Sequence, residues 1–568
     1  SFDWMREPIL CISFSPAPGE AYVVPLVGQH CVEIWDSQDK LKVEDTLRRI
    51  FQSGTPKGGQ NVKFDVKFLT HNGFPVNNLS FDTLVEHYLL NENLPHDLKF
   101  LASHELEESG YDEELRLALP SKNTPFDSVP TEILWKYVAF DADVTQTLHQ
   151  LFTSRLEKDN PKLLRFYREV LIPLERVLTE MEIRGVVLDE ERIQKVSKEY
   201  EGKIKETESK FFAEVGRDIN LNSPKQLSDL FFKERKLTSV KKTATGAESV
   251  DDDVINALAD GGDPVAELLR GRRTYVKWKG TYVDGPYEQR GPDGRYHADY
   301  NITGTVTGRL SSNLHAIPDD PTIRGIYCAP PGYVFMGADY SQIEMLVLAA
   351  LAKEEIILEL YAHREDLHKL MASYIFRIRP EEVTPELRRA VKFVVFGLNY
   401  GRGVWSIAKG LQISEAEAKE IIDQYFKTFS RIKDWREETK LFAKRHGYVE
   451  SVFGRRRHLN FDAADYREAA AMERQAMNTP IQGAAADITN IALVRVGAAE
   501  KNRETYSLPV NTQHDALLFY TREDMWKEDV VKIRGIMERK VPELGVIPHV
   551  SITVGTRWGD DSLMKKES

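Results

Sequence analysis

Two apolar, strand-like runs that each end at an aspartate constrain the fold of this chain more than any other feature. In "GYVFMGADYSQIEMLVLAAL" the apolar run ends at Asp339, and helical spacing of apolar residues follows. In "LPVNTQHDALLFY" two apolar runs flank His514 and Asp515, which predicts a hairpin with these residues at its tip. We therefore expect a sheet that brings both aspartates to one edge.

A lone aspartate at the end of a strand is most often a turn or cap residue. A pair supports another interpretation, because two carboxylates that hold two Mg²⁺ ions about 3.5–4 Å apart are used for in-line displacement at phosphorus. Mg²⁺ binds through few carboxylates plus substrate phosphates, which suits so sparse a ligand set. Asp339 and Asp515 therefore predict a site for two Mg²⁺ ions, for which Mn²⁺ can substitute.

The stretch "RRAVKFVVFGLNYG" predicts a helix with an unusual face. Positions four apart lie on one slowly drifting stripe of a helix, and here they are Arg388, Lys392, Phe396 and Tyr400. The opposite side carries the apolar residues expected in the core, which are Val391, Val394, Val395 and Leu398. Two cations exclude a buried core stripe, so the first face is predicted to bind a ligand.

Length and composition predict a globular protein of several domains. A chain of 568 residues is too long for one hydrophobic core, so we expect roughly two to four domains. It has no apolar run of about 18 residues and no signal-peptide pattern, so we expect a soluble, intracellular protein without a membrane partner. Its three cysteines form no CxxC pattern, which disfavours disulfides and a zinc site.

The net charge of −12 argues only weakly against a nucleic-acid partner. Net charge averages over the whole surface, whereas binding needs one local basic groove. Short basic clusters occur around Arg388 and at Arg455, Arg456 and Arg457. For the second cluster, a solvated turn and a DNA contact are equally good interpretations.

Along the chain, residues 1–157 predict a compact α/β domain. "ILCISFSP" and "AYVVPL", separated by "APGE", predict a hairpin, and "DADVTQTLHQLFTSRLEK" predicts a helix. Composition becomes polar near residue 158, and a long amphipathic helix is expected over about 162–183. In "NSPKQL" Ser223 is expected to cap a helix whose first turn contains Pro224.

Three ordered motifs carry a resemblance to the family A DNA polymerases of the bacterial large-fragment type. "DYSQIE" at 339–344 resembles motif A of that family, "RRAVKFVVFGLNYG" its motif B, and "QHDA" at 513–516 its motif C. "TGTVTGRLSS" and "MNTPIQGAAADI" are also similar, and the resemblance covers essentially the whole chain.

The resemblance implies a multidomain fold that is α/β plus α+β. An RNase H-like 3′→5′ exonuclease domain, residues 1–157, is followed by a right-hand polymerase domain, residues 158–568. The latter combines a palm with an antiparallel sheet, helical fingers and a helical thumb. The implied limits are about 190–290 for the thumb, about 295–350 and 459–568 for the palm, and about 351–458 for the fingers.

The implied reaction is attack of a primer 3′-hydroxyl on the α-phosphorus of a dNTP, directed by template DNA. The resemblance implies that the metal ligands are Asp339, Asp515 and the main-chain carbonyl of Tyr340, and that Lys392 is catalytic. Glu344 is the implied steric gate against a ribose 2′-hydroxyl, and Phe396 the implied contact to the sugar. The implied dNTP-binding residues are Arg388, Lys392, Phe396, Tyr400, Glu344, His368 and Gln342. For His368, a satisfied histidine on a helix surface is the alternative.

Primer–template DNA is the implied macromolecular partner. Contacts to minor-groove acceptors that all base pairs share can sense geometry without reading sequence. The residues implied in DNA contact are Arg309, Arg474, Asn478, Gln482 and His514. Two departures from the family pattern are Ala516, where a second acid is common, and His315 with Ala316, where amides are usual.

The N-terminal part resembles the second and third motifs of the proofreading exonuclease. "GQNVKFDVKFL" and "YVAFDADVT" imply Asp65 and Asp141 as metal-linked carboxylates and Tyr137 as the residue that orients water. Asp82 is more simply a helix cap. The first motif, Asp-x-Glu, is absent, so we expect the natural protein to begin earlier and this chain to proofread poorly or not at all.

Other functions fit less of the sequence. A single-subunit RNA polymerase is disfavoured by Glu344 as a bulky gate, and an exonuclease alone leaves the residues after 157 unexplained. A non-catalytic DNA-binding protein has no use for Asp339 and Asp515. We expect a monomer in the cytoplasm of a bacterium or of a phage-infected host, with an organelle as the alternative.

Overall fold

The structure is a computed structural model, and the residues that it describes are 3–121, 124–239, 241–243, 246–364, 366–399, 401–462 and 465–565. The chain divides into two compact units. Unit 1 consists of Ser1–Arg184, Ala298–His315 and Met336–Ile552, and unit 2 of Gly185–His297, Ala316–Phe335 and Thr553–Ser568. The domain limits expected from sequence, including the one near residue 158, stay a prediction.

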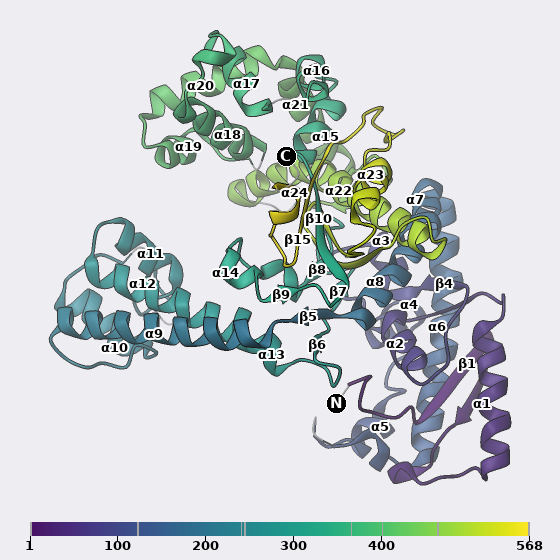
Figure 1. Cartoon of the computed structure of the whole chain (residues 1–568). Coiled ribbons are helices and arrows are strands. Elements are labelled where there is room, and N and C mark those ends of the chain that lie inside the picture. The colour runs from purple at the N-terminus through teal and green to yellow at the C-terminus, as the bar shows by residue number, and fades with distance from the viewer. Residues whose placement is uncertain are drawn as a thin grey trace. The chain divides into compact units, whose positions relative to one another are not determined.

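The N-terminal part of unit 1 contains the predicted hairpin (Figure 1). Strands β1 (Cys11–Ala17) and β2 (Glu20–Pro25) pair antiparallel, and helix α6 (Thr131–Asp159) packs against both. A separate sheet consists of β3 (Lys57–Gly59) and β4 (Leu79–Asp82), which are parallel. The other helices here are α1 (Ser37–Gln52), α2 (Val62–His71), α3 (Thr83–Leu90), α4 (Leu98–Leu106) and α5 (Glu113–Ala118), with 3-10 turns at Gln29–Cys31 and Phe126–Ser128. The predicted hairpin and the predicted helix are both confirmed.

The helix expected over 162–183 is present in three consecutive segments. Helix α7 (Pro161–Phe166) and helix α8 (Ile172–Arg184) are joined by a π-helical segment at Tyr167–Leu171. Asn160 caps the start of α7 by accepting a hydrogen bond from the main-chain N–H of Leu163 at 3.0 Å. Polar side-chain capping of this kind satisfies an otherwise unpaired N–H at the first turn.

A four-stranded sheet carries the two aspartates. Its strand order is β13 (Ser507–Gln513), β14 (Ala516–Arg522), β10 (Tyr333–Tyr340) and β15 (Val550–Gly555). Register pairs Gln513 with Ala516, which confirms the predicted hairpin with a two-residue tip. The helices that follow or precede these strands are α15 (Ile343–Ala352), α22 (Tyr466–Lys501) and α23 (Trp526–Met537).

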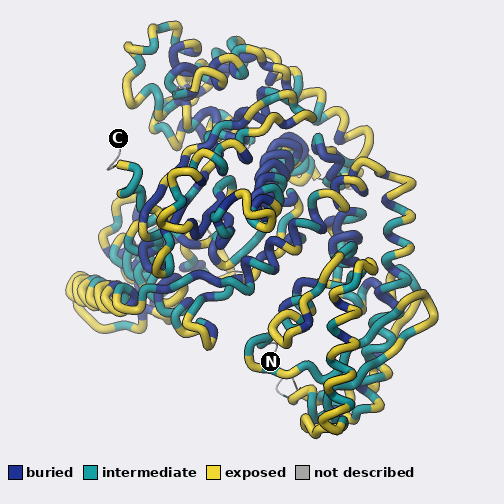
Figure 2. Tube along the Cα trace, turned by 45° about the vertical axis from the view of Figure 1, so that its right-hand side comes forward, coloured by how far each residue is buried: buried dark blue, intermediate teal, exposed yellow. Residues whose placement is uncertain are grey.

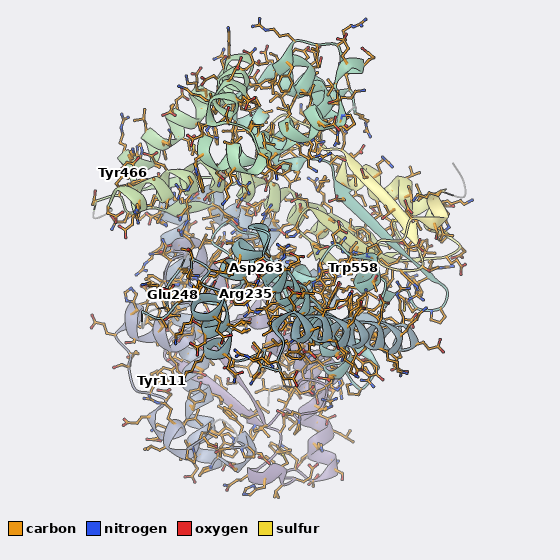
Figure 3. All side chains as sticks on the ribbon, turned by 90° about the vertical axis from the view of Figure 1, so that its left-hand side faces the viewer. Tyr111, Arg235, Glu248, Asp263, Tyr466 and Trp558 are labelled. Carbon is orange, nitrogen blue, oxygen red and sulfur yellow. The ribbon has the colours of Figure 1, made fainter. Side chains whose placement is uncertain are left out.

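Helix α22 supplies much of the buried interior of unit 1. Every residue from 483 to 490 is buried, which makes it a continuously buried stretch of the chain (Figure 2). Its first residue, Tyr466, is 88% exposed and projects from the surface (Figure 3). One helix therefore runs from solvent into the core.

Unit 1 also contains short strands, which are β7 (Tyr300–Asn301), β8 (Ser311–Ser312), β11 (Tyr448–Glu450) and β12 (Arg456–His458). A 3-10 turn follows β8 at Asn313–Ala316.

A group of helices separates α15 from α22 in the chain. They are α16 (Glu355–Ala362), α17 (Leu367–Phe376), α18 (Pro385–Asn399), α19 (Val404–Leu411), α20 (Glu415–Thr428) and α21 (Ser430–His446), with a 3-10 turn at Pro380–Glu382. Helix α18 begins at Pro385, and the hydroxyl of Thr384 caps it by accepting a hydrogen bond from the N–H of Leu387 at 3.3 Å. The four apolar residues expected in its core are all buried, at 0–4% exposure.

Unit 2 is mainly helical. Its small sheet has the order β6 (Arg295–Tyr296), β5 (Val186–Leu188), β9 (Tyr327–Cys328), and its core lies among the helices that follow β5. Ser223 caps α10 as predicted, by accepting from Gln226 N–H, and Arg235 forms an ion pair with Asp263 at 2.6 Å (Figure 3). The helices are α9 (Glu190–Val215), α10 (Pro224–Ser228), α11 (Asp252–Asp260), α12 (Pro264–Lys277), α13 (Gly285–Glu288), α14 (Pro321–Arg324) and α24 (Ser562–Lys565), with π-helical turns at Asp229–Glu234 and Trp278–Asp284.

Two general expectations can be compared with the structure. The three cysteines, Cys11, Cys31 and Cys328, are free thiols. Among the described helices, none is long and apolar enough to span a membrane.

Candidate active site

The sheet brings the two predicted aspartates together. Strands β14 and β10 are neighbours, and the main-chain N–H of Tyr340 donates to the main-chain carbonyl of Asp515 at 3.1 Å. Asp339 is exposed at the penultimate position of β10. Asp515 lies at the hairpin tip beside His514, whose φ of 54° is the left-handed conformation that a tight turn requires. Two carboxylates distant in sequence therefore share one end of the sheet.

The carboxyl of Asp515 is electrostatically perturbed. Burial raises its pKa to about 6; Glu344 and Asp339 raise the pKa further, while the Arg309 guanidinium opposes them. Its Oδ1 atom is buried and accepts no hydrogen bond from any described residue. A buried carboxylate oxygen without a donor is costly unless a cation satisfies it, so the donor set fits a divalent metal ion.

The protein ligands near Asp515 are few. Within the described part of the chain, no three His, Cys, Asp or Glu side chains are grouped so that they could hold a metal ion by themselves. A cation held by Asp339 and Asp515 would complete its shell with water or substrate oxygens. Mg²⁺ has this preference, because it keeps several waters and combines few carboxylates with phosphate oxygens.

Two of the predicted residues are paired with each other. Arg309 forms an ion pair with Glu344, in the first turn of α15, at 2.6 Å. Gln342 precedes this helix with φ of 51°, and its buried Oε1 has no hydrogen-bond partner among the described residues. Sequence reasoning assigned Arg309 and Glu344 to different ligands and missed their pairing, which joins positions 35 residues apart.

The predicted stripe of α18, which begins at Arg388, lies next to helix α17. Arg388 pairs with Asp366, the N-cap residue of α17, and the ammonium of Lys392 lies 6.0 Å from the ring centroid of Phe396. The ring of His368 stacks against Phe396 with centroids 6.0 Å apart and planes 22° apart. Three of the four predicted stripe residues and His368 therefore share one surface. Tyr400, the fourth, lies outside the described residues.

His368 is buried, so the alternative of a histidine on a helix surface is wrong. It is 3% exposed, and its Nε2 has no hydrogen-bond partner among the described residues. Burial lowers its pKa to about 4; Asp366 opposes this shift, whereas Lys392 and Arg388 add to it. The imidazole is thus neutral at pH 7 and lies beside the ring of Phe396 on α18.

The predicted stripe on α22 is accessible. Arg474 is exposed, and Asn478 and Gln482 are half-buried at successive helical turns. The side chain of Arg474 crosses the turn after α18, where a Cβ on Gly401 would lie 2.4 Å from Arg474 Cγ. Gly401 also has φ of +72°, so a side chain there would be both strained and obstructed. The start of α22 and the end of α18 are therefore in contact.

For Arg455, both sequence-based interpretations of the cluster Arg455–Arg457 are wrong. Arg455 is 7% exposed and forms an ion pair with the fully buried Asp487 at 3.0 Å, so it is neither solvated nor free for DNA. Arg457 pairs with Glu92 at 2.9 Å, and Arg456 with Glu450 at 3.0 Å. A buried cation requires such a partner, but positions 455 and 487 are too distant in sequence for the pairing to be visible.

The predicted exonuclease residues also gather. Desolvation of the Asp65 carboxyl, on α2, raises its pKa to about 7, and the nearby carboxylates of Asp82 and Asp141 contribute to the shift. Asp82 accepts hydrogen bonds from the N–H groups of Leu84 at 2.8 Å and Val62 at 2.7 Å. The prediction that Asp82 is a helix cap is confirmed, and it serves two helices.

Two tyrosines flank Asp141 on α6. Tyr111 donates to Asp141 Oδ1 at 2.8 Å, and the centroid of its ring lies 6.1 Å from that of the Tyr137 ring. Burial raises the pKa of Asp141, and hydrogen bonds from Tyr137 and Tyr111 oppose the shift. Sequence reasoning found Tyr137 and missed Tyr111, for which no local signal exists.

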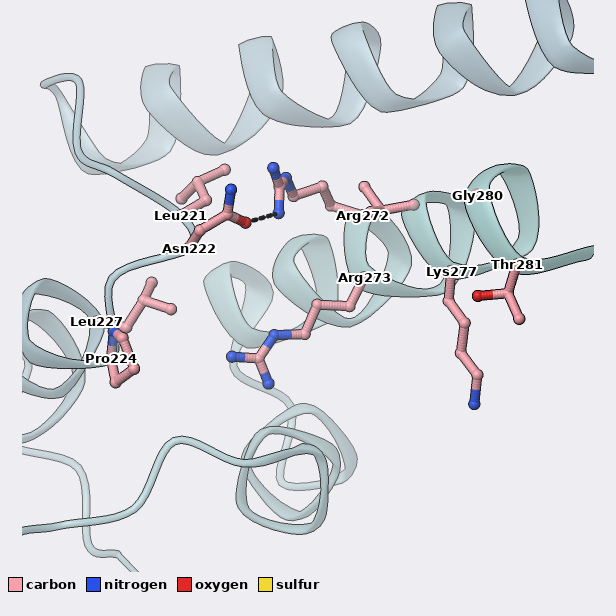
Figure 4. A pocket seen from close by; sticks show the side chains of 10 residues that line it. Leu221, Asn222, Pro224, Leu227, Arg272, Arg273, Lys277, Gly280 and Thr281 are labelled. Carbon is pink, nitrogen blue, oxygen red and sulfur yellow. Dashed lines mark hydrogen bonds between the residues drawn. The ribbon is translucent and has the colours of Figure 1, made fainter. Parts of the chain in front are cut away.

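A basic pocket in unit 2 was also missed. It has a volume of about 540 Å³ between the start of α10 and the end of α12 (Figure 4). Arg272 is held there by Asn222 at 2.9 Å and by Glu208 at 2.8 Å, Arg273 pairs with Asp252 at 2.9 Å, and Lys277 is exposed (Figure 4). The signal was present in "RGRRTYVKWK", residues 270–279, where five of ten residues are cations.

Comparisons with known proteins agree with this arrangement. The family model for DNA polymerase family A matches residues 190–560, and the model for 3′-5′ exonuclease matches residues 22–157. The predicted order of an exonuclease domain followed by a family A polymerase domain is thereby confirmed.

Individual relatives cover nearly the whole chain. The DNA polymerase I of Borreliella burgdorferi is 32% identical over 571 residues, which cover 99% of this chain and 61% of the relative. The thermostable DNA polymerase I of Thermus thermophilus is 36% identical over 484 residues, 82% of this chain and 57% of the relative. The chain thus spans about three fifths of the length of these curated relatives.

A solved structure is similar over the whole fold. It is the POL domain of Pol1 from M. smegmatis in complex with DNA primer-template and dNTP, with 31% identity and a TM-score of 0.83, covering 96% of this chain and 92% of that one. The aspartate pair and the stripe of α18 that carries Arg388 and Lys392 agree with the matched family models. The chain belongs to DNA polymerase family A.

Proposed function

We propose that this chain is a template-directed DNA polymerase that adds dNTPs to a primer 3′-hydroxyl. One observation supports this most strongly: Asp339 and Asp515 are brought together by the hydrogen bond from Tyr340 N–H to the carbonyl of Asp515, while Oδ1 of Asp515 is buried and no described residue donates to it. A site that leaves a buried carboxylate oxygen unsatisfied suits a cation that arrives with substrate.

Asp339, Asp515 and the main-chain carbonyl of Tyr340 would hold two Mg²⁺ ions, for which Mn²⁺ can substitute. When bound, the ions activate the attacking hydroxyl and stabilise the leaving pyrophosphate. Ala516 supplies no further carboxylate, so the ligand set of the chain stays sparse. The chain itself fixes the distance between the two aspartates through the pairing of β10 with β14.

The surface of α18 and α17 is proposed to bind the dNTP. Lys392 is exposed, and no described carboxylate lies within 4 Å of its ammonium, so it is available to pair with the triphosphate and serve catalysis there. Arg388 has its guanidinium oriented by Asp366, and Nε2 of His368, which no described residue hydrogen-bonds, is proposed to contact a phosphate oxygen. Phe396, 38% exposed, would pack on the sugar.

The gate of the site is proposed to be Glu344, with Gln342 and Tyr400 as further neighbours of the nucleotide. The ion pair with Arg309 holds the Glu344 carboxylate at one place on the first turn of α15. A carboxylate so restrained can exclude a ribose 2′-hydroxyl by its bulk, and this separates a DNA polymerase from an RNA polymerase.

Primer–template DNA is the proposed partner, bound by a monomer in the cytoplasm of a bacterium or of a phage-infected host. Arg309, Arg474, Asn478, Gln482 and His514 are the proposed contacts in unit 1. Arg273 and Lys277, which line the pocket of unit 2, add cations suited to a phosphate backbone. Such local clusters provide the basic surface that a net charge of −12 obscures.

The N-terminal site is proposed to be a weak 3′→5′ exonuclease. Asp65 and Asp141 would hold metal, and Tyr137 would orient the attacking water. Asp82 accepts hydrogen bonds from the N–H groups of Asn61, Val62 and Leu84 at 2.7–3.0 Å, so its carboxylate has a structural role as a cap. Little or no removal of a mismatched primer end is the expected result, and efficient removal that Asp141→Ala abolishes would contradict it.

Primer extension tests the proposal directly. The chain should extend a DNA primer on a DNA template with dNTPs only when Mg²⁺ or Mn²⁺ is present, and Asp339→Ala should bind the primer–template without extending it. Equal use of dNTPs and NTPs would favour an RNA polymerase, whereas degradation without any extension would leave the exonuclease alone.

A further inference from the structure

The chain just after Asp339 is fastened to the start of β15 in an unusual way. Ser341 N–H donates to the carbonyl of His549 at 2.9 Å. Facing residues of an antiparallel pair normally exchange two such bonds. Here the hydroxyl of Tyr361 is inserted in place of the second direct bond. His549 N–H donates to this hydroxyl at 3.0 Å, and the hydroxyl donates to the carbonyl of Ser341 at 2.8 Å.

The hydroxyl of Tyr361 is held firmly at this position. Tyr361 lies on α16, which follows α15 in the chain (Figure 1), and it is 7% exposed. Its ring stacks against the imidazole of His549 with centroids 4.9 Å apart and planes only 6° apart. The two ring nitrogens of His549 are buried without hydrogen-bond partners among the described residues, so the imidazole contributes through stacking.

The same segment is fixed on its other side by Asp515. Tyr340 N–H donates to the carbonyl of Asp515, and the next residue, Ser341, is tied to His549 and Tyr361. The peptide that joins residues 340 and 341 therefore lies between two neighbouring segments. The bond from Tyr340 N–H orients the peptide that joins residues 339 and 340, and the bond from Ser341 N–H orients the next peptide, which carries the carbonyl of Tyr340.

We propose that Tyr361 is a positioning residue of the polymerase site: its hydroxyl completes the last link between β10 and β15 and so fixes Asp339 and the Tyr340 carbonyl. The inference rests on the proposed function. Without the hydroxyl, the Ser341 carbonyl and the His549 N–H lose their shared partner, and the turn gains freedom. A displacement of about 1 Å at reacting groups can cost on the order of 100-fold in rate.

The variant Tyr361→Phe removes only the hydroxyl and keeps the stacked ring. We expect kcat for primer extension to fall roughly 5- to 50-fold, because the shift acts on the reacting geometry. KM for dNTP and Kd for primer–template should change less than about twofold, since the hydroxyl lies on neither proposed binding surface. Tyr506→Phe is the matched control, because no described residue hydrogen-bonds the Tyr506 hydroxyl, and it should match the wild type.

A second variant separates the hydroxyl from the stacking. In His549→Phe both main-chain links persist and no side-chain hydrogen bond to a described residue is lost, so this variant should keep wild-type kcat. A loss of kcat in His549→Phe that equals the loss in Tyr361→Phe would assign the effect to packing and overturn the proposal.

Metal binding provides a readout apart from activity. Free Mn²⁺ is followed by electron paramagnetic resonance in complexes with a primer that lacks its 3′-hydroxyl, with Asp515→Ala as the background. Tyr361→Phe should bind Mn²⁺ about 3- to 10-fold more weakly than wild type and Tyr506→Phe.

Unchanged kcat and Mn²⁺ affinity in Tyr361→Phe would overturn the inference, even if its melting temperature falls. A rise in KM for dNTP at constant kcat would overturn it as well. A wild-type chain that extends no primer would instead refute the proposed function, and the Mn²⁺ titration would still judge the role of Tyr361.

Discussion

Asp487→Ala should loosen the contact between α22 and the N-terminal part of unit 1. Asp487 is fully buried and receives hydrogen bonds from Arg455 Nε and Nη2 at 3.0–3.1 Å, and the Arg455 guanidinium lies 5.9 Å from the ring of Tyr88. Removing one partner leaves a buried charge uncompensated, which costs about 3–5 kcal/mol. By contrast Glu450→Ala breaks the more exposed pair with Arg456, for which less than about 1 kcal/mol is expected.

Hydrogen–deuterium exchange read by mass spectrometry measures this cost locally. Amides of α22 around residue 487 and of α3 should exchange roughly 100- to 1000-fold faster in Asp487→Ala, since a tenfold change is about 1.4 kcal/mol. Glu450→Ala should change them less than about fivefold.

The double variant Arg455→Met, Asp487→Leu should restore much of the protection. Burial raises the pKa of Asp487 although Arg455 opposes the shift, so desolvation outweighs attraction at this carboxylate. Replacing such a pair by apolar side chains is often neutral or stabilising. Exchange in Asp487→Ala at the wild-type rate, or a double variant as unprotected as the single one, would refute this reasoning.

Three further outcomes are expected. Lys392→Glu should raise KM for dNTP by about 10- to 100-fold or more in steady-state extension, because a hydrogen bond to a charged group contributes about 1.5–3 kcal/mol. An unchanged KM would contradict the placement of Lys392 in the triphosphate site. Phe396→Tyr should incorporate dideoxynucleotides roughly tenfold more readily in competition with dNTPs, since its new hydroxyl supplies one polar contact, and equal discrimination would contradict the sugar contact. The double variant Arg273→Ala, Lys277→Ala should reduce the slope of log K for DNA binding against log salt concentration by about 1 for each phosphate that is no longer neutralised. An unchanged slope would mean that the unit 2 pocket does not contact DNA.

Features that depend on local periodicity could be predicted from the sequence. The hairpin tip at His514 and Asp515 follows from two apolar runs around two polar residues, and the buried side of α18 follows from helical spacing. The cap role of Asp82 and the start of α18 at Pro385 depend on residues within a few positions, so they could be predicted as well.

Pairings between distant segments could not be predicted. Arg309 with Glu344, Arg455 with Asp487, and Tyr361 with His549 join positions 35, 32 and 188 residues apart, and no spacing rule indicates them. The basic cluster at 455–457 was misread for this reason, because a run of cations looks the same whether it is solvated or paired with buried carboxylates.

Single-turnover incorporation of one nucleotide by wild type, Asp339→Asn and Asp515→Asn tests the central claim most directly. Each substitution keeps the side-chain size but removes the charge that would hold Mg²⁺. We expect the rate to fall at least about 1000-fold, equal to about 4 kcal/mol, while Kd for primer–template changes only a few-fold. Incorporation by Asp515→Asn at a rate near that of wild type would contradict the account.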